Sequence, residues 1–202
     1  MVDVRSSAEL DAETDLDRPG PRRRPGTIAL VAVAVGVVLA VFIVVLATRD
    51  PSSDRTVDSP LLGRLAPAIV GETVDGGRFD LDDHQGRFVL VNFFASWCVP
   101  CIREHPELVS FAERHARAGD AEVVSVVFGD EVEDVRAFFD EQGGDWPVVT
   151  NDDGRLALEY AVAGVPESYL IAPDGTVIYK IVGGVTSTGL DRLLAEAQEA
   201  AS

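Results

Sequence analysis

Cys98 and Cys101, the two cysteines of the chain, lie in one motif with the sequence Trp-Cys-Val-Pro-Cys. The motif follows an apolar, β-branched and aromatic run, residues 88–94, that predicts a buried strand. It precedes residues 102–118, whose pattern predicts a helix. Two cysteines separated by two residues at such a strand-to-helix junction are typical of a thiol-disulfide redox centre.

The junction predicts different roles for the two sulfurs. Cys98 falls at the amino end of the helix, where unpaired N–H groups and the positive end of the helix dipole favour a thiolate. We therefore expect Cys98 to be the more acidic and exposed sulfur, which attacks. Cys101, one turn inside the helix, is expected to be buried and to resolve the mixed disulfide.

Three other interpretations of the cysteine pair are less favoured. A structural zinc site wants four ligands, and of the three histidines only His105 is near, while His84 and His115 fit surface or packing positions. Attachment of c-type haem needs a histidine directly after the second cysteine, where the chain has Ile102. A purely structural disulfide that closes so short a loop would add little stability.

The charge of the chain argues against nucleic acid as a partner. The formal net charge is −17, and residues 51–202 hold 11 basic against 27 acidic side chains. Neutralising phosphates requires clustered lysine and arginine, and this part of the chain has no such cluster. The excess negative charge indicates a solvated acidic surface.

The N-terminal part predicts a membrane anchor. Residues 1–26 form a polar tail without apolar periodicity, which is expected to be disordered. A transmembrane anchor is expected at residues 27–48. Its uncharged run of 21 residues, from Thr27 to Ala47, is long enough to cross a hydrocarbon core of ~30 Å. A cleaved signal peptide is the alternative, although its apolar region usually has ~7–15 residues.

The flanks of this segment predict its orientation. Arg22, Arg23 and Arg24 lie on its N-terminal side, so the N-terminus is expected to remain in the cytoplasm. The rest of the chain would then be extracytoplasmic, in a compartment where thiols tend to be oxidised. Residues 49–60 are expected to be a polar linker, and residues 61–202 the globular domain, which we expect to be monomeric.

The pattern of residues 61–202 predicts a central mixed sheet with helices on both faces, an α/β fold. Strands and helices alternate first, and an antiparallel hairpin and a final amphipathic helix follow. Strands are expected at 68–70, 78–81, 88–94, 122–128, 148–150, 168–171 and 176–179, and helices at 102–118, 134–142, 156–160 and 188–200.

The motif at Cys98 and Cys101, followed by Gly164-Val165-Pro166 ahead of a strand and hairpin, resembles the thioredoxin superfamily. The resemblance covers residues 61–202. It implies a thioredoxin-like fold, a cis proline at Pro166 and thiol-disulfide oxidoreductase activity through the cysteine pair, with no separate cofactor or metal.

Further segments resemble the membrane-anchored branch that serves cytochrome c maturation, the CcmG/DsbE, ResA and TlpA-like proteins. They are Ala66-Pro67, residues 92–97, residues 104–106 and residues 165–167. This resemblance implies that the substrate is the haem-binding cysteine pair of apocytochrome c, or another extracytoplasmic thiol protein. It also implies a thiol-transferring membrane reductase as the electron donor.

Asn92 departs from general thioredoxins, which keep a buried aspartate there that moves protons to the second cysteine. Glu104, three residues after Cys101, and Glu167, next to Pro166, are the candidates for that task, and the branch carries acids at both positions. The alternative interpretation is an exposed helix acid for Glu104 and a solvated loop acid for Glu167. A buried carboxylate near the sulfurs would raise their pKa and accept the resolving proton.

Trp97, Val165 and Pro166 are expected to bind the substrate. Trp97 is expected to shield the sulfurs and to line the substrate face, and the backbone of Val165 to pair with an extended substrate segment. Two other functions remain open. One is an oxidant that forms disulfides in secreted proteins, and the other is a non-catalytic adaptor that holds an apoprotein.

Overall fold

The computed structural model describes residues 26–47, 54–150 and 154–200. The chain divides into two compact units, residues 1–49 and 50–202, each described here by itself. In the first unit, Thr27–Ala47 form helix α1, which has no acidic residue in its first turn and no basic residue in its last. Judged on length and apolarity together, none of the helices in the described part of the chain qualifies as a membrane span. The tail expected at residues 1–26 lies, apart from Gly26, outside the described residues.

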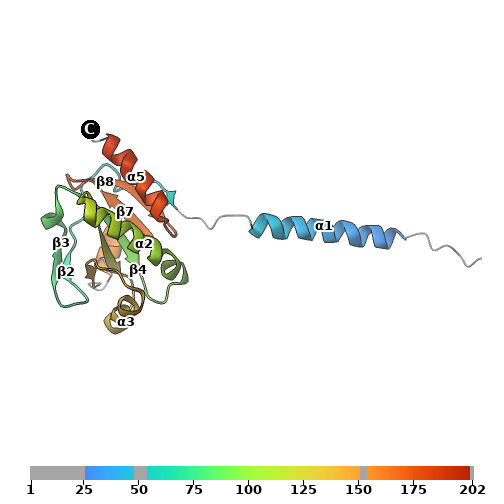
Figure 1. Cartoon of the computed structure of the whole chain (residues 1–202), viewed down its shortest axis with the longest axis horizontal. Helices are drawn as coiled ribbons and strands as arrows, with labels where there is room; N and C mark the ends of the chain where they lie inside the picture. Colours follow the sequence, from blue (N-terminus) through green and yellow to red (C-terminus); the bar gives the residue numbers. More distant parts are fainter. Residues whose placement is uncertain (1–25, 48–53, 151–153, 201–202) are drawn as a thin grey trace, which may run out of the picture. The chain divides into compact units, whose positions relative to one another are not determined.

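The second unit is built on a six-stranded mixed sheet in the order β1-β8-β7-β4-β5-β6 (Figure 1). Its strands are β1 Arg55–Thr56, β4 Phe88–Phe94, β5 Ala121–Val127, β6 Val148–Val149, β7 Glu167–Ile171 and β8 Val177–Val182. Strands β4, β5 and β6 are parallel, whereas β7 is antiparallel to β4, and β8 is antiparallel to both β7 and β1. All seven residues of β4 are buried, as expected of a central strand covered on both faces.

Helices cover both faces of this sheet. They are α2 Val99–Ala118, α3 Val132–Gln142, α4 Arg155–Glu159 and α5 Ser187–Ala200. Figure 1 shows α2 and α5 on the same side of the sheet, where Leu108 of α2 and Leu190 of α5 share a core with Leu90 of β4. On the opposite face, Leu156 and Tyr160 at α4 pack against Phe93 of β4. The expected mixed sheet flanked by helices is therefore confirmed.

A two-stranded sheet and a short 3-10 helix complete the fold. Strands β2 Val70–Glu72 and β3 Arg78–Asp80 form the expected hairpin, followed by the 3-10 helix η1 Leu81–His84. Phe79 of this hairpin is buried against the α4 face of the main sheet. The hairpin thus covers apolar surface that α4, a helix of five residues, leaves open.

The domain begins earlier along the chain than the expected boundary at residue 61. Arg55 and Thr56, within the expected linker, form β1 and pair with Val182 and Ile181 of β8. The Val57 N–H donates to the Lys180 carbonyl at 2.9 Å. Part of the polar segment therefore forms an edge strand, because backbone hydrogen bonds to β8 need no apolar side chains.

Candidate active site

Cys98 and Cys101 form a disulfide, with their Cα atoms 5.2 Å apart. Cys98 is the N-cap residue of α2, and its Sγ accepts a hydrogen bond from the Cys101 N–H at 3.2 Å. Pro100 lies in the first helical turn, where its missing N–H costs nothing. The disulfide is therefore held at the positive end of the helix dipole, as the sequence predicts.

The prediction that Cys98 is exposed is wrong, whereas the predicted burial of Cys101 is confirmed. Cys98 is 4% exposed and Cys101 is 2% exposed. Both pack in an apolar cluster with Phe94, Val127 and Val135. Because the strand-to-helix turn folds back onto this cluster, a position at the helix end does not leave the whole residue in solvent. Exposure alone therefore does not distinguish the sulfurs.

The loop before β7 faces the disulfide. The peptide bond between Val165 and Pro166 is cis, as the resemblance implies. The Val165 carbonyl oxygen lies 3.6 Å from the Cys98 Sγ. Val165 and Pro166, distant from the cysteines in sequence, are thus brought to them.

Trp97 is exposed at the rim of the disulfide, with 59% of its surface accessible. Its indole Nε1–H donates to the Gly129 carbonyl at 3.1 Å, which ties it to the loop after β5. The preceding Ser96 N–H donates to the Asp130 carboxylate at 2.6 Å in the same loop. Trp97 therefore lies outside the core, as expected of a residue that lines the substrate face.

Glu104 lies one turn beyond Cys101 on α2 and is only 3% exposed. Its Oε1 accepts from the Asn92 Nδ2 at 3.0 Å, and its Oε2 accepts from the Val185 N–H at 2.9 Å. The Asn92 Nδ2 also donates to the Ser168 Oγ at 3.1 Å. The interpretation of Glu104 as an exposed helix acid is therefore excluded. Asn92 on β4 holds a carboxyl supplied by the facing helix.

Burial raises the pKa of Glu104 from its ordinary value of 4.5 to about 7. The hydrogen bonds from Asn92 and Val185 pull the pKa down, and the negative charge of Asp54 pushes it up. Desolvation outweighs these smaller effects. Glu104 therefore exchanges its proton near neutral pH, as a group that accepts and releases protons in an enzyme should.

Glu167 is also buried, at 3% exposure, but its carboxylate is paired with Lys180. Its Oε2 lies 2.8 Å from the Lys180 Nζ, and its Oε1 accepts from the Ala163 N–H at 3.1 Å. The Lys180 Nζ also donates to the Ala161 carbonyl at 2.9 Å and lies 5.3 Å from the centre of the Tyr169 ring. Burial alone would lower the pKa of Lys180, but its bonds to Glu167 and Tyr169 raise it overall.

The two acids lie on opposite faces of the sheet. Ser168 pairs with Asn92 in the strand register and shares the α2 face with Glu104. Because side chains alternate along a strand, Glu167 points to the other face, where Tyr169 and Lys180 lie. The structure thus places Glu104, not Glu167, in the hydrogen-bond network of the α2 face.

The histidines fill packing positions. His105 is 3% exposed and packs edge-on against Phe138 and Phe139 of α3. Its Nε2 lies 2.8 Å from the Gly143 carbonyl oxygen, and burial lowers its pKa. His84 and His115 lie beside the carboxylates of Glu122 and Asp120. Among the described residues, no group of three or more potential ligands is placed to hold a metal ion.

A groove of about 700 Å³ opens beside the disulfide. Three segments line it: the first turns of α2, the cis-proline loop and the turn between β8 and α5. The lining residues are Pro100, Arg103, Glu104, Glu107, residues 163–167 and residues 182–186. Both candidate acids and the cis proline therefore border one surface, although the acids belong to different networks.

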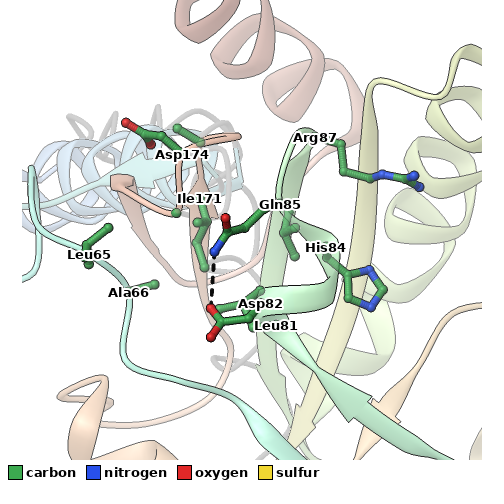
Figure 2. A pocket seen from close by; sticks show the side chains of 12 residues that line it. Leu65, Ala66, Leu81, Asp82, His84, Gln85, Arg87, Ile171 and Asp174 are labelled. Carbon is green, nitrogen blue, oxygen red and sulfur yellow. Dashed lines mark hydrogen bonds between the residues drawn. The ribbon is translucent and has the colours of Figure 1, made fainter.

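A second, smaller cavity of about 120 Å³ lies at the other end of β4 (Figure 2). Val89 of β4 and Ile171 of β7 line it, together with Leu65, His84 and Arg87. The cysteines follow the opposite end of β4, so this cavity is separate from the redox centre.

Sequence reasoning did not single out Lys180, Ser168 or Val185. Lys180 is the only lysine of the chain and lies within an apolar run that forms β8, a signal that could have indicated a buried partner. Ser168 and the backbone N–H of Val185 carry no comparable signal, because their roles depend on contacts between distant segments.

A cysteine pair that closes a disulfide at a helix end, against a cis-proline loop, supports thiol-disulfide exchange. Together with the mixed sheet, it defines the class of thioredoxin-like thiol-disulfide oxidoreductases. The chain belongs to the Redoxin family, whose model matches residues 61–196.

Named relatives have the same class of activity. The thiol:disulfide interchange protein CycY of Rhizobium leguminosarum bv. viciae is 38% identical over 118 residues, which are 58% of this chain and 61% of CycY. The thiol-disulfide oxidoreductase ResA of Bacillus subtilis is 32% identical over 126 residues, 62% of this chain and 70% of ResA. This chain thus spans less than two thirds of CycY but more than two thirds of ResA.

A solved structure supports the fold. The crystal structure of a thiol:disulfide interchange protein of the thioredoxin family from Chlorobium tepidum TLS matches with a TM-score of 0.62 and 29% sequence identity. The match covers 70% of this chain and 99% of that protein.

Proposed function

We propose that the protein is an extracytoplasmic, membrane-tethered reductant of protein disulfides, and that its substrate is the haem-binding cysteine pair of apocytochrome c. The observation that carries the reducing direction is the buried Glu104 carboxyl one turn from Cys101, with a pKa of about 7. When ionised, this carboxylate opposes a thiolate nearby and so makes the dithiol a better electron donor.

The reaction balances as a two-electron exchange. In the reduced protein, the Cys98 thiolate attacks one sulfur of the substrate disulfide, which releases the other substrate sulfur as a thiolate. Cys101 then loses its proton and attacks Cys98, which frees the second substrate sulfur. The substrate gains two electrons and two protons, and the protein ends in the disulfide form seen here.

Glu104 is proposed to handle the proton of Cys101. Its position on α2 keeps it one turn from this cysteine, and Asn92 holds its orientation. With a pKa of about 7, it is ionised in a large fraction of molecules at neutral pH and can accept a proton. The role of the strand aspartate in general thioredoxins would thus pass to a helix glutamate.

The substrate is proposed to lie along the groove beside the disulfide. Trp97 and Val99 expose apolar surface next to the cysteines, at 59% and 56% exposure. The Val165 backbone borders the groove and faces Cys98, so an extended substrate segment could pair with it. The assignment to apocytochrome c, and to a thiol-transferring membrane protein as electron donor, rests on the resemblance to the cytochrome c maturation branch.

The location is proposed from the N-terminal sequence. Thr27–Ala47 are 21 uncharged residues in helical conformation, and Arg22, Arg23 and Arg24 precede them. These features support a single anchor with the N-terminus in the cytoplasm and the redox domain outside. A reporter fused after Ser202 should be active only outside the cytoplasm, and activity inside would reverse the topology.

The reducing function is tested by measuring the reduction potential and turnover. We expect a potential nearer ~−270 mV, as in thioredoxin, than ~−120 mV, as in a strong periplasmic oxidant. The reduced protein should reduce an oxidised peptide with a Cys-x-x-Cys-His sequence, and Cys98→Ser should not. A potential above about −150 mV would favour the disulfide-forming alternative. Equal effects of wild type and Cys98→Ser on the apoprotein would favour an adaptor.

A further inference from the structure

Asp54, the residue before β1, holds the turn between β8 and α5. Its Oδ1 accepts from the Thr186 N–H at 2.7 Å, and its Oδ2 accepts from the Thr186 Oγ1 at 2.6 Å. Its own N–H donates to the Gly184 carbonyl at 2.9 Å. One residue thus makes three hydrogen bonds to a turn that lies 130 positions further along the chain.

Gly189 in the first turn of α5 leaves the space for this carboxylate. A Cβ atom at Gly189 would lie 2.2 Å from the Asp54 Cγ, a distance that real atoms do not tolerate. Asp54 itself has a φ of 58°, in the left-handed region that aspartate adopts more readily than most residues. The fit between Asp54 and Gly189 shows that the contact is built into the packing of α5.

The turn that Asp54 holds also contacts the redox helix α2. The Val185 N–H donates to the Glu104 Oε2 at 2.9 Å, and the Ser187 N–H donates to the Glu107 Oε2 at 2.9 Å. Residues 182–186 form one wall of the groove beside the disulfide. A displacement of this turn would therefore change both the groove and the hydrogen bonds of Glu104.

The Glu104 carboxyl is surrounded by several polar and charged groups, of which Asp54 is one. Burial raises the pKa of this carboxyl most, the hydrogen bonds from Asn92 and the Val185 N–H lower it, and the charge of Asp54 adds a smaller rise. The other charged groups that border the same groove are Arg103 and Glu107 on α2, and Glu167, which Lys180 neutralises. Cys98 and Cys101 join these groups once they are reduced.

We propose that Asp54 is a positioning residue of the redox centre: it clamps the β8–α5 turn so that the Val185 N–H remains on Glu104. The segment that follows the proposed anchor in sequence then helps to fix the geometry of the active site. The catalytic meaning of this proposal rests on the proposed function. Its tests use the resting oxidised protein, so they remain interpretable if the substrate assignment fails.

The clamp is tested by amide hydrogen exchange of the oxidised full-length chain in detergent micelles, followed by NMR. Gly189→Ala leaves every charge in place but expels the Asp54 carboxylate. We expect Val185 and Thr186 to exchange at least about tenfold faster, which corresponds to ~1.4 kcal/mol of local opening. Asp54→Ala should give the same acceleration, and it replaces Gly189→Ala if that variant does not fold.

The charge is tested by the NMR titration of the Glu104 carboxyl. Asp54→Asn keeps an acceptor oxygen for the Thr186 N–H but removes the negative charge, so the Glu104 pKa should fall. Asp58→Asn, which alters an exposed acid of the same segment, should leave both exchange and titration unchanged. Val185 exchange at the wild-type rate in Gly189→Ala, or a wild-type Glu104 titration in Asp54→Asn, overturns the proposal.

Discussion

Glu104 is a buried acid whose pKa lies near neutral pH. The residue is 3% exposed, and its carboxyl accepts hydrogen bonds from the Asn92 amide and the Val185 N–H. Neither of these donors carries a full positive charge. Neutral donors compensate an ionised carboxylate only in part, so desolvation prevails and the pKa rises. Glu167, equally buried, has Lys180 as a charged partner instead. The two acids therefore lie in different electrostatic surroundings.

The first prediction concerns stability and pH. Glu104 has a pKa of about 7 when folded and 4.5 ordinarily, so between these values the folded protein binds the extra proton. The stabilisation that the protonated Glu104 carboxyl gives to the folded protein is present below about pH 4.5 and is lost as pH rises toward 7. In urea unfolding, wild type should lose on the order of 3 kcal/mol more than Glu104→Gln across this window.

His105 makes the comparison with Glu104→Gln necessary. Burial lowers the pKa of His105, so its contribution has the opposite sign and stability rises with pH near its ordinary value. Both proteins contain His105, and its effect cancels in their difference. Glu113→Gln, an exposed acid on the same helix, serves as the control and should follow wild type. Parallel pH curves for wild type and Glu104→Gln would contradict the assignment.

At the scale of elements, the amino end of α2 predicts which sulfur reacts. The two cysteines differ little in exposure, so the difference must be electrostatic. Cys98 accepts the Cys101 N–H and lies at the positive end of the helix, whereas Cys101 lies one turn from the Glu104 carboxyl. The dipole is worth ~0.3–1 kcal/mol at such a position, and a nearby carboxylate opposes a thiolate.

The second prediction follows for the reduced protein. Under limiting alkylating reagent at neutral pH, Cys98 should be modified first, because its thiolate is the better stabilised one. Cys101→Ala should trap mixed disulfides through Cys98, and Cys98→Ala should trap far fewer. Mass spectrometry of the labelled peptides identifies the site, and preferential labelling of Cys101 would reverse the two roles.

The ion pair between β7 and β8 gives the third prediction. Lys180→Met leaves the Glu167 carboxylate buried without its cation, which should cost about 3–5 kcal/mol in urea unfolding. The double variant Glu167→Gln with Lys180→Met should recover much of this loss, because no lone charge remains. Arg155→Met, which breaks the exposed pair with Glu159, is the matched control and should cost less than about 1 kcal/mol.

The same double variant tests whether Glu167 acts on the sulfurs. Its carboxylate faces Lys180 and Tyr169 on the side of the sheet opposite Glu104. We therefore expect the double variant to keep a nearly wild-type reduction potential, whereas Glu104→Gln should make the potential less negative. A larger change in the double variant would return Glu167 to the role that the sequence resemblance implies.

At the scale of the whole molecule, local patterns in the sequence predicted most of the redox domain. The apolar run at 88–94 and the cysteine motif act through neighbouring residues, so their structural consequences are readable from sequence, whereas the cis bond at Pro166 is implied by the family resemblance. Glu104 contacts Val185, 81 positions away along the chain, Glu167 contacts Lys180, 13 positions away, and Asp54 contacts Thr186, 132 positions away. Burial and pairing of such groups depend on tertiary packing, which periodicity does not encode.

The structure at the start of the domain also depends on tertiary packing. Residues 51–60 are polar and rich in serine, which predicts a linker, yet Asp54 and β1 make backbone and side-chain hydrogen bonds to β8 and the following turn. Such hydrogen bonds stabilise by about 1 kcal/mol each. The segment should therefore contribute measurably to folding.

The last prediction compares two truncations of the chain. A protein that starts at Asp50 retains Asp54 and β1 and should be a folded, monomeric, redox-active domain. One that starts at Leu61 loses them and should be less stable by about 2–6 kcal/mol in urea unfolding, since at least the three hydrogen bonds of Asp54 and the one of Val57 are removed, at ~0.5–1.5 kcal/mol each. Its disulfide should still form, because the α2 end and the cis-proline loop are untouched. Equal stability of the two proteins would mean that residues 50–60 act only as a tether.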